Sequence, residues 1–216
     1  MPRPRIKICC MQSHEEVAMG VHAGADAVGF VGLGLSGPEV RDDDTIARLV
    51  RQVPPAVDAW LLTRVDKPDA LVAQILRTGV TTVQLCDAVP TACWEAIRAQ
   101  TSARIVQVVH VQGPAAIDEA LAAAPHVDAL LLDSGTTVGP TPVYGGTGAT
   151  HDWSISAEIV RHSTRPAWLA GGLRADNVRQ AIATVQPFGL DLCSGVRTNH
   201  LLQADKLAAF MHAATP

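Results

Sequence analysis

The sequence predicts an α/β protein with the fold of a (β/α)8 TIM barrel, built as a single domain over residues 1–216. This length lies within the range of a small barrel. Apolar runs and helical patterns alternate along the whole chain, eight of each. The last two apolar runs both stop at small residues, which is typical of phosphate-binding barrel strands. A doubly wound open sheet is the alternative, although the first turn, Cys9–Ser13, lacks the GxGxxG of its dinucleotide-binding form.

Eight apolar segments predict the strands. They are rich in valine, isoleucine and leucine and show no polar alternation, as expected for parallel strands buried on both faces. Their ranges are Ile6–Cys9, Ala27–Val31, Ala59–Thr63, Thr82–Leu85, Ile105–Val109, Ala129–Leu132, Ala167–Ala170 and Leu190–Cys193.

Eight segments of helical pattern follow these strands. Ser13 and Glu16 form a capping box at the start of the first, where their side chains satisfy free backbone N–H groups. Gly24 ends that helix, as a C-terminal glycine does. The predicted helices are His14–Ala23, Thr45–Gln52, Pro68–Thr78, Thr91–Ala99, Pro114–Ala124, Ser154–Arg161, Asn177–Thr184 and Asp205–Ala213.

Composition and charge exclude several classes of partner. The formal net charge is -4 and the few lysines are scattered, so the chain lacks the basic stripe of a nucleic-acid-binding protein. No apolar run reaches the roughly 20 residues that span a bilayer. The five cysteines are an odd number without a CxxC motif. Because the N-terminus also lacks the apolar region of a signal peptide, we expect reduced thiols and a cytoplasmic protein.

One connection is much longer than the others. Residues 134–153 have no apolar periodicity, are rich in glycine and threonine, and carry the one tyrosine of the chain. Loops of this length in compact domains are usually functional or disordered. Because this one follows the sixth predicted strand, where barrel active sites lie, we predict a lid with glycine hinges.

Two consecutive units near the C-terminus predict a phosphate site. The segments Trp168–Leu173 and Gly189–Val196 are apolar runs that stop at glycine or serine before a helical pattern. Such a strand end exposes backbone N–H groups, which bind phosphate without a lysine.

Polar residues that directly follow a strand point into the mouth of a barrel. Here they are Cys9, Cys10, Cys86, Asp87, His110, Asp133 and Ser194. Two facing groups that exchange protons above a phosphate site suggest the isomerisation of a phosphosugar.

Nine motifs in order resemble those of one family. They are Lys7–Cys9, Ala23–Phe30, Val83–Leu85, Leu131–Ser134, Tyr144–Gly148, Asp152–Trp153, Leu169–Leu173, Asn177–Val178 and Asp191–Val196. Together they span nearly the whole chain and resemble phosphoribosylanthranilate isomerase, the barrel enzyme of tryptophan (aromatic amino acid) biosynthesis. The resemblance implies an Amadori rearrangement of an N-(5-phosphoribosyl)amine to a 1-amino-1-deoxyribulose 5-phosphate, with a small phosphosugar as substrate and with no cofactor or metal.

The resemblance also implies roles for individual residues. Asp133 is the general acid that protonates the ribose ring oxygen, and Cys9 is the general base that removes the C2 proton. The substrate phosphate is bound by Gly171, Gly172, Ser194 and Gly195. Further substrate contacts are expected from Cys10, Ser36, Gln84, His110, Gly145, Gly146 and Arg197.

The chain departs from the family pattern where the amine half of the substrate would lie. Cys10 stands where the family usually has glycine, and either thiol of the pair could be the base. Pro38 stands where the family has the arginine that holds the anthranilate carboxylate, and Arg41, Arg64, Arg174 or Arg197 could substitute for it from neighbouring loops. Gln84-Leu-Cys-Asp87 replaces Gln-Leu-His-Gly, and Arg197 replaces a glutamate. These departures suggest a paralogue that acts on a different phosphosugar amine.

Two other interpretations remain open. Cys10, Cys86, His110 and Cys193 are suitable zinc ligands, although the barrel separates the strands that carry them. A non-catalytic phosphosugar-binding protein would keep the phosphate site but would not need both Cys9 and Asp133. The sequence leaves open whether the chain is a monomer or a homodimer.

Overall fold

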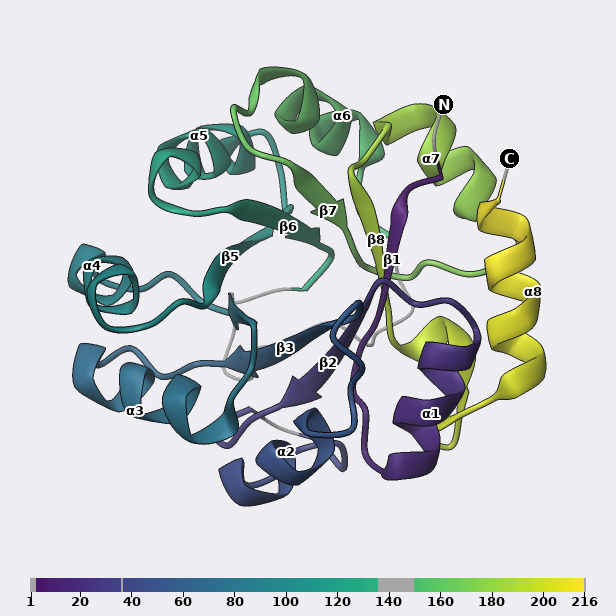
Figure 1. Ribbon diagram of the computed structural model, residues 1–216. Coiled ribbons are helices and arrows are strands. Elements are labelled where there is room, and N and C mark those ends of the chain that lie inside the picture. Colours follow the sequence, from purple (N-terminus) through teal and green to yellow (C-terminus); the bar gives the residue numbers. More distant parts are fainter. Residues whose placement is uncertain (1–2, 36, 136–149, 216) are drawn as a thin grey trace.

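The computed structural model describes residues 3–35, 37–135 and 150–215. Eight parallel strands pair in chain order and close into a barrel, because β1 pairs with β8 as well as with β2. In Figure 1 these strands form the inner ring and helices α1–α8 surround it. The predicted barrel is confirmed, and the open-sheet alternative is wrong because that sheet would have two unpaired edges.

The element bounds agree with the predicted ranges to within two residues at each end. The strands are β1 Arg5–Ile8, β2 Ala27–Val31, β3 Asp58–Thr63, β4 Thr82–Leu85, β5 Arg104–His110, β6 Ala129–Asp133, β7 Ala167–Leu169 and β8 Gly189–Leu192. The helices are α1 His14–His22, α2 Asp43–Val50, α3 Pro68–Thr78, α4 Thr91–Gln100, α5 Ala115–Ala123, α6 Trp153–His162, α7 Val178–Val185 and α8 Ala204–Ala214. Among the described residues, no helix is long and apolar enough to cross a membrane.

The chain between β8 and α8 differs from the prediction. A 3-10 helix, Ser194–Val196, follows the last strand, and a small antiparallel hairpin of β9 (Arg197–Thr198) and β10 (Leu201–Leu202) comes next. The two residues between these strands, Asn199 and His200, have φ angles of 48° and 66°. Positive φ at both positions is typical of a tight two-residue hairpin turn. The glycine-ended strand therefore does not open directly onto α8.

Two predicted details at helix starts also change. Ser13 does accept a hydrogen bond from the Glu16 N–H, at 3.4 Å, as an N-cap. The Glu16 carboxylate instead binds the N–H groups of Gln12 and Leu202 and the guanidinium of Arg197. The predicted lid, residues 134–153, ends before Trp153, which begins α6, and residues 136–149 lie outside the described part of the chain.

Side chains on the strands alternate between the helix layer and the barrel interior. On β6, Leu130 and Leu132 belong to the large core between strands and helices, whereas Leu131 belongs to the interior cluster. On β1, Ile6 and Ile8 pack outward. Because the strand period is two, Lys7 on β1 points inward, as does Cys9 directly after it.

The end of the barrel below these residues is filled by two tryptophans. Trp60 and Trp168 meet edge to face with ring centroids 5.0 Å apart, and the interior cluster of apolar side chains surrounds them. The Trp168 ring occupies the space beside Gly189, where an added Cβ would lie 2.4 Å from a ring carbon. Most of the side chains that fill this end of the interior are therefore apolar.

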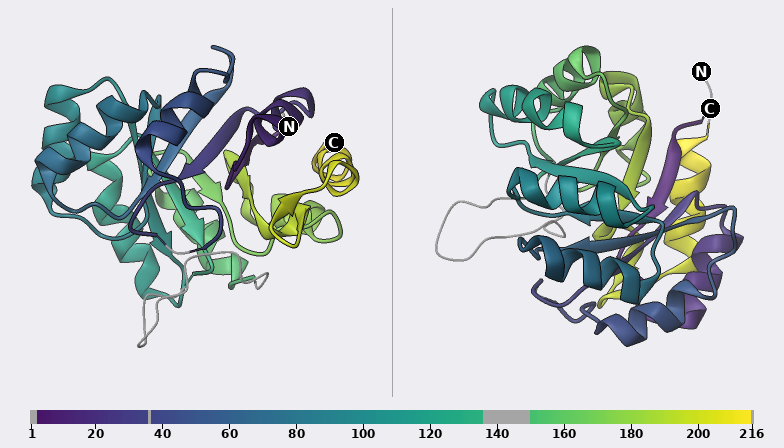
Figure 2. Two further views of the ribbon diagram at one scale, coloured as in Figure 1. Left: turned by 90° about the horizontal axis from the view of Figure 1, so that it is seen from below. Right: turned by 60° about the vertical axis from the view of Figure 1, so that its left-hand side comes forward.

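The start of β1 and the end of α8 lie near one another in every view (Figure 2).

We expect Gly189→Ala to lower the free energy of unfolding by about 1–3 kcal/mol, because the new methyl group overpacks against Trp168. Urea unfolding followed by tryptophan fluorescence measures the change. Gly113→Ala is the matched control, since a Cβ there meets nothing within 4 Å, and it should change the free energy by less than about 0.5 kcal/mol. Equal free energies of unfolding for the two variants would contradict the close packing of Trp168 against Gly189.

Candidate active site

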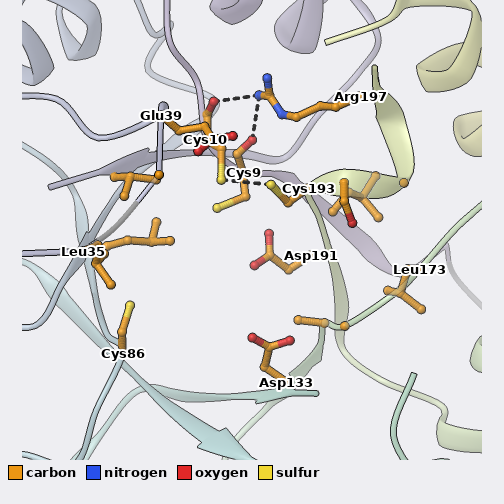
Figure 3. A pocket seen from close by; sticks show the side chains of 18 of the residues that line it. Cys9, Cys10, Leu35, Glu39, Cys86, Asp133, Leu173, Asp191, Cys193 and Arg197 are labelled. Atoms are coloured by element: carbon orange, nitrogen blue, oxygen red, sulfur yellow. Dashed lines mark hydrogen bonds between the residues drawn. The ribbon is translucent and has the colours of Figure 1, made fainter. Parts of the chain in front are cut away.

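A cavity of about 560 Å³ lies at the carboxyl ends of the strands. Most of the residues predicted from the sequence to form the site line it: Cys9, Cys10, Gln84, His110, Asp133, Gly171, Gly172, Ser194, Gly195 and Arg197. Figure 3 shows several of these side chains around one open space. The predicted site residues Ser36, Gly145 and Gly146 lie outside the described residues.

Cys9 lies directly after β1 and is buried against the cavity. Its backbone N–H donates to the carbonyl of Leu192 at 2.7 Å, which continues the β1–β8 ladder by one step. A hydrogen bond with the Cys10 thiol is the largest cause that lowers the pKa of the Cys9 thiol. The positive charge of Lys7 lowers it further, and together they outweigh burial, which acts in the opposite direction.

A buried ion pair lies beneath Cys9. Lys7 is fully buried, and its Nζ is 2.8 Å from Oδ1 of Asp191 and 5.1 Å from the centroid of the Trp60 ring. Burial opposes the charge on Lys7, but the attraction of Asp191 and Cys9 raises the pKa of its ammonium group overall. A Cβ at Gly29 would lie 3.1 Å from both the Cys9 sulfur and the Lys7 nitrogen, so the two groups share the space beside this glycine. Lys7 is thus a fixed cation next to the thiol.

Asp133 ends β6 on the opposite side of the cavity from Cys9, with Asp191 between them in Figure 3. Its Oδ1 accepts a hydrogen bond from the N–H of Ser134 at 2.8 Å, and His110 is its register partner on β5. Burial raises the pKa of Asp133, although His110 and the Ser134 N–H act in the opposite direction. Asp133 therefore holds its proton more tightly than an exposed carboxyl group.

The predicted phosphate-binding residues form two adjacent turns. Gly171 and Gly172 follow β7 with φ angles of 87° and 61°, which favour glycine. A Cβ added at Gly171 would lie 2.5 Å from the Ser134 Oγ. A Cβ added at Gly195 would lie 2.0 Å from the Leu173 carbonyl oxygen. These contacts show that the glycines are needed for packing. They also leave backbone alone at the cavity wall, so a ligand there meets peptide groups.

The guanidinium of Arg197 is bound by the protein itself. It donates to the Glu16 carboxylate at 2.9 Å and to the carbonyls of Cys9 and Cys10 at 3.0 and 2.7 Å (Figure 3). It also donates to the His200 carbonyl at 2.8 Å. Arg197 therefore supports the end of β1, and its expected contact with the substrate stays a prediction.

No other arginine considered for a substrate carboxylate lines the cavity. Arg41 donates to the carbonyl of Pro38, and Arg64 forms an ion pair with Asp87. The cavity wall near Pro38 is formed instead by Glu39 and His200, whose side chains are 2.8 Å apart. The loop after β2 thus presents an acidic side chain to the cavity.

Gln84, Cys86 and His110 line a third wall. Oε1 of Gln84 is buried and has no hydrogen-bond partner among the described residues. Burial raises the pKa of Cys86, so this thiol stays protonated. Nε2 of His110 lies 3.0 Å from the Cys86 carbonyl. Within the described ranges, no three His, Cys, Asp or Glu side chains are grouped closely enough to hold a metal ion, so the arrangement does not support the zinc alternative.

Four residues that shape this site were not predicted from the sequence. Lys7 and Asp191 carried a signal, because each is a charged residue inside an otherwise apolar strand. Glu39 and His200 carried none, because their approach depends on the hairpin and on the loop after β2.

Comparison with known proteins gives one consistent result. Residues 6–213 match the family model of N-(5'-phosphoribosyl)anthranilate isomerase. The chain is 35% identical to N-(5'-phosphoribosyl)anthranilate isomerase 2 of Methanosarcina mazei, over 97% of this chain and 93% of that protein.

Solved structures agree with the family match. The phosphoribosyl anthranilate isomerase of Thermotoga maritima superposes with a TM-score of 0.84 at 28% identity, and 98% of each chain is covered. Another such isomerase, with a TM-score of 0.81, 26% identity and 98% of each chain covered, was solved with reduced 1-(o-carboxyphenylamino)-1-deoxyribulose 5-phosphate. The barrel, the cavity with its thiol and carboxyl group, and these full-length matches show that the chain belongs to the N-(5'-phosphoribosyl)anthranilate isomerase family, the intramolecular isomerases of tryptophan biosynthesis.

Proposed function

We propose that this chain converts N-(5'-phosphoribosyl)anthranilate into 1-(o-carboxyphenylamino)-1-deoxyribulose 5-phosphate, with Asp133 as general acid and Cys9 as general base. The observation that carries this proposal is the position of these two groups across one cavity, with shifts of their pKa values in opposite senses. An acid that keeps its proton and a thiol that loses its proton are the pair that an Amadori rearrangement needs.

The first step opens the sugar ring. Asp133 donates its proton to the ribose ring oxygen, the bond from C1 to that oxygen breaks, and the nitrogen lone pair forms a Schiff base with C1. Burial supports this role because it raises the pKa of Asp133, so the carboxyl group holds its proton more tightly. The backbone N–H of Ser134 then stabilises the carboxylate that remains.

The second step moves a proton from carbon. The Cys9 thiolate removes the C2 proton, and the electrons of that C–H bond pass toward the cationic Schiff base to give an enolamine. Tautomerisation of the enolamine gives the ketone product. Lys7 supports this step because its buried charge favours the thiolate before substrate arrives. We assign Lys7 as a positioning residue that acts through Cys9.

The phosphate end of the substrate fits the two turns after β7 and β8. Gly171, Gly172 and Gly195 present only backbone to the cavity, and Ser194 begins the short 3-10 helix there. Peptide N–H groups of such turns bind phosphate without a basic side chain.

A second candidate function is the same rearrangement of a different phosphosugar amine. The observation that favours it is the loop after β2, where Pro38 and Glu39 line the cavity and Arg41 is directed to the Pro38 carbonyl. An acidic side chain repels the carboxylate of anthranilate, so a neutral or basic amine substituent suits this wall better.

The proposal is tested by turnover of freshly generated N-(5'-phosphoribosyl)anthranilate. The loss of substrate fluorescence measures the rate. Cys9→Ala and Asp133→Asn should each lower kcat by about 10²- to 10⁴-fold, because each removes one proton-transfer group. Cys93→Ala is the matched control, since Cys93 is a buried thiol of α4 outside the cavity. Full activity in either site variant would refute its role, and an inactive wild type would favour the second candidate.

Lys7→Met should shift the acidic limb of the pH profile of kcat/KM to higher pH. The base must be deprotonated, so activity rises as pH passes through the pKa of Cys9, and loss of the Lys7 charge raises that pKa. Lys67→Met, which removes an exposed lysine, should leave the limb in place. The double variant Lys7→Met, Asp191→Asn also removes the unpaired carboxylate, and it should show a smaller shift in the same direction, because Asp191 raises the pKa of Cys9 less than Lys7 lowers it. An unmoved limb in both Lys7 variants would contradict the positioning role.

A further inference from the structure

Two cysteines that the proposed reaction does not use as base or acid meet at the rim of the cavity. The sulfur atoms of Cys10 and Cys193 are 3.0 Å apart (Figure 3). This is about 1 Å beyond the ~2.05 Å length of a disulfide bond. Both residues are partly exposed and both line the cavity. Small oxidants that enter the cavity can therefore reach them.

The backbone on each side suits a cross-link. Ile8 and Leu192 are register partners on β1 and β8, and the N–H of Cys9 still donates to the Leu192 carbonyl. Cys10 lies two residues after β1 and Cys193 directly after β8, so both follow strands that are paired about 4.8 Å apart. Arg197 holds the Cys10 carbonyl at 2.7 Å, so the segment that carries this thiol is fixed beside Cys193.

Cys10 also has a backbone conformation that side chains rarely adopt. Its φ is 67°, in the left-handed region that favours glycine. In this conformation its thiol meets Cys193, as Figure 3 shows. The other thiol on the cavity wall, Cys86, lies across the open space from this pair in the same view. Cys193 is thus the thiol from another segment of the chain that Cys10 contacts.

We infer that Cys10 and Cys193 form a reversible disulfide when the protein meets a peroxide, and that this pair is a redox modification site at the rim of the active-site cavity. The Cys193 thiolate attacks a peroxide oxygen, the O–O bond breaks, and the released hydroxide takes up the proton that Cys193 lost. The sulfur of Cys10 then attacks the resulting sulfenic acid, the S–S bond forms, and the hydroxyl group leaves as water with the Cys10 proton. Two thiols are oxidised and hydrogen peroxide is reduced to two waters.

The disulfide would slow the isomerase, a consequence that depends on the proposed function. The Cys10 thiol is the hydrogen-bond partner that lowers the pKa of Cys9 most. After oxidation Cys10 has no proton to donate, so the pKa of Cys9 rises and less thiolate is present at neutral pH. A dithiol reductant restores the Cys10 thiol and with it the activity.

Peptide mapping tests the cross-link without reference to turnover. The reduced full chain is treated with one equivalent of hydrogen peroxide, alkylated and digested with trypsin. Cys9 and Cys10 lie in the peptide Ile8–Arg41, and Cys193 lies in Gln180–Arg197. We expect these peptides to be joined, with the loss of two hydrogens, in the wild type, in Cys9→Ala and in the control Cys93→Ala. We expect no joined peptide in Cys10→Ala or Cys193→Ala.

The opposite pattern would overturn the inference. A cross-link that is present in Cys10→Ala but absent in Cys9→Ala would assign the bond to Cys9. If the wild type forms no cross-link, the proposed modification site is refuted. For the activity consequence, peroxide should lower kcat/KM of the wild type several-fold, with recovery in dithiothreitol. The kcat/KM of Cys193→Ala should be the same before and after peroxide treatment. An unchanged wild-type rate despite a complete cross-link would refute the switch and leave the modification site standing.

Discussion

The pairing of the first and last strands is the constraint on which the site depends. It closes the barrel, and its register sets Lys7 opposite Asp191 and Ile8 opposite Leu192. Every second residue of a barrel strand points inward, so this register places Lys7, the proposed base Cys9 and Asp191 on one interior wall. Residues about 184 positions apart in the chain become a buried ion pair.

Two buried ion pairs stabilise this seam in different ways. Lys7 and Asp191 lie inside the barrel, where the free energy needed to desolvate both charges offsets much of their attraction. Such a pair is a weak source of stability, but it keeps a positive charge beside Cys9 at all physiological pH values. Glu16 and Arg197 join α1 to the hairpin and to the end of β1. This second pair fixes the backbone that carries the two adjacent thiols.

The departures from the family pattern fall at two places with different physical consequences. At the seam, Cys10 occupies a left-handed backbone position suited to glycine and contacts Cys193, so the proposed base Cys9 has a second thiol as its neighbour. At the loop after β2, Pro38 stands where the resemblance implies an arginine, and Glu39, which contacts His200, lines the cavity. The first departure alters the chemistry of the base, whereas the second alters the charge that the amine half of a substrate meets.

The sequence by itself determined the barrel, its order of elements and the residues at the strand ends. These features depend on local patterns: apolar runs without alternation, helical periodicity, and glycine or serine at the ends of strands. The resemblance to a family then implied roles for Cys9 and Asp133. Lys7 and Asp191 were visible only as charged residues within apolar strands, because nothing local says which charges meet.

Only the tertiary structure decided which residues face one another. The partner of Lys7, the contact between Cys10 and Cys193, and the bonds that occupy Arg197 all cross the β1–β8 seam or the hairpin after it. The hairpin itself was missed because Asn199 and His200 adopt positive φ in a turn that the strands on either side impose. Register and closure are properties of the whole barrel, so contacts that depend on them have no signature in any one segment.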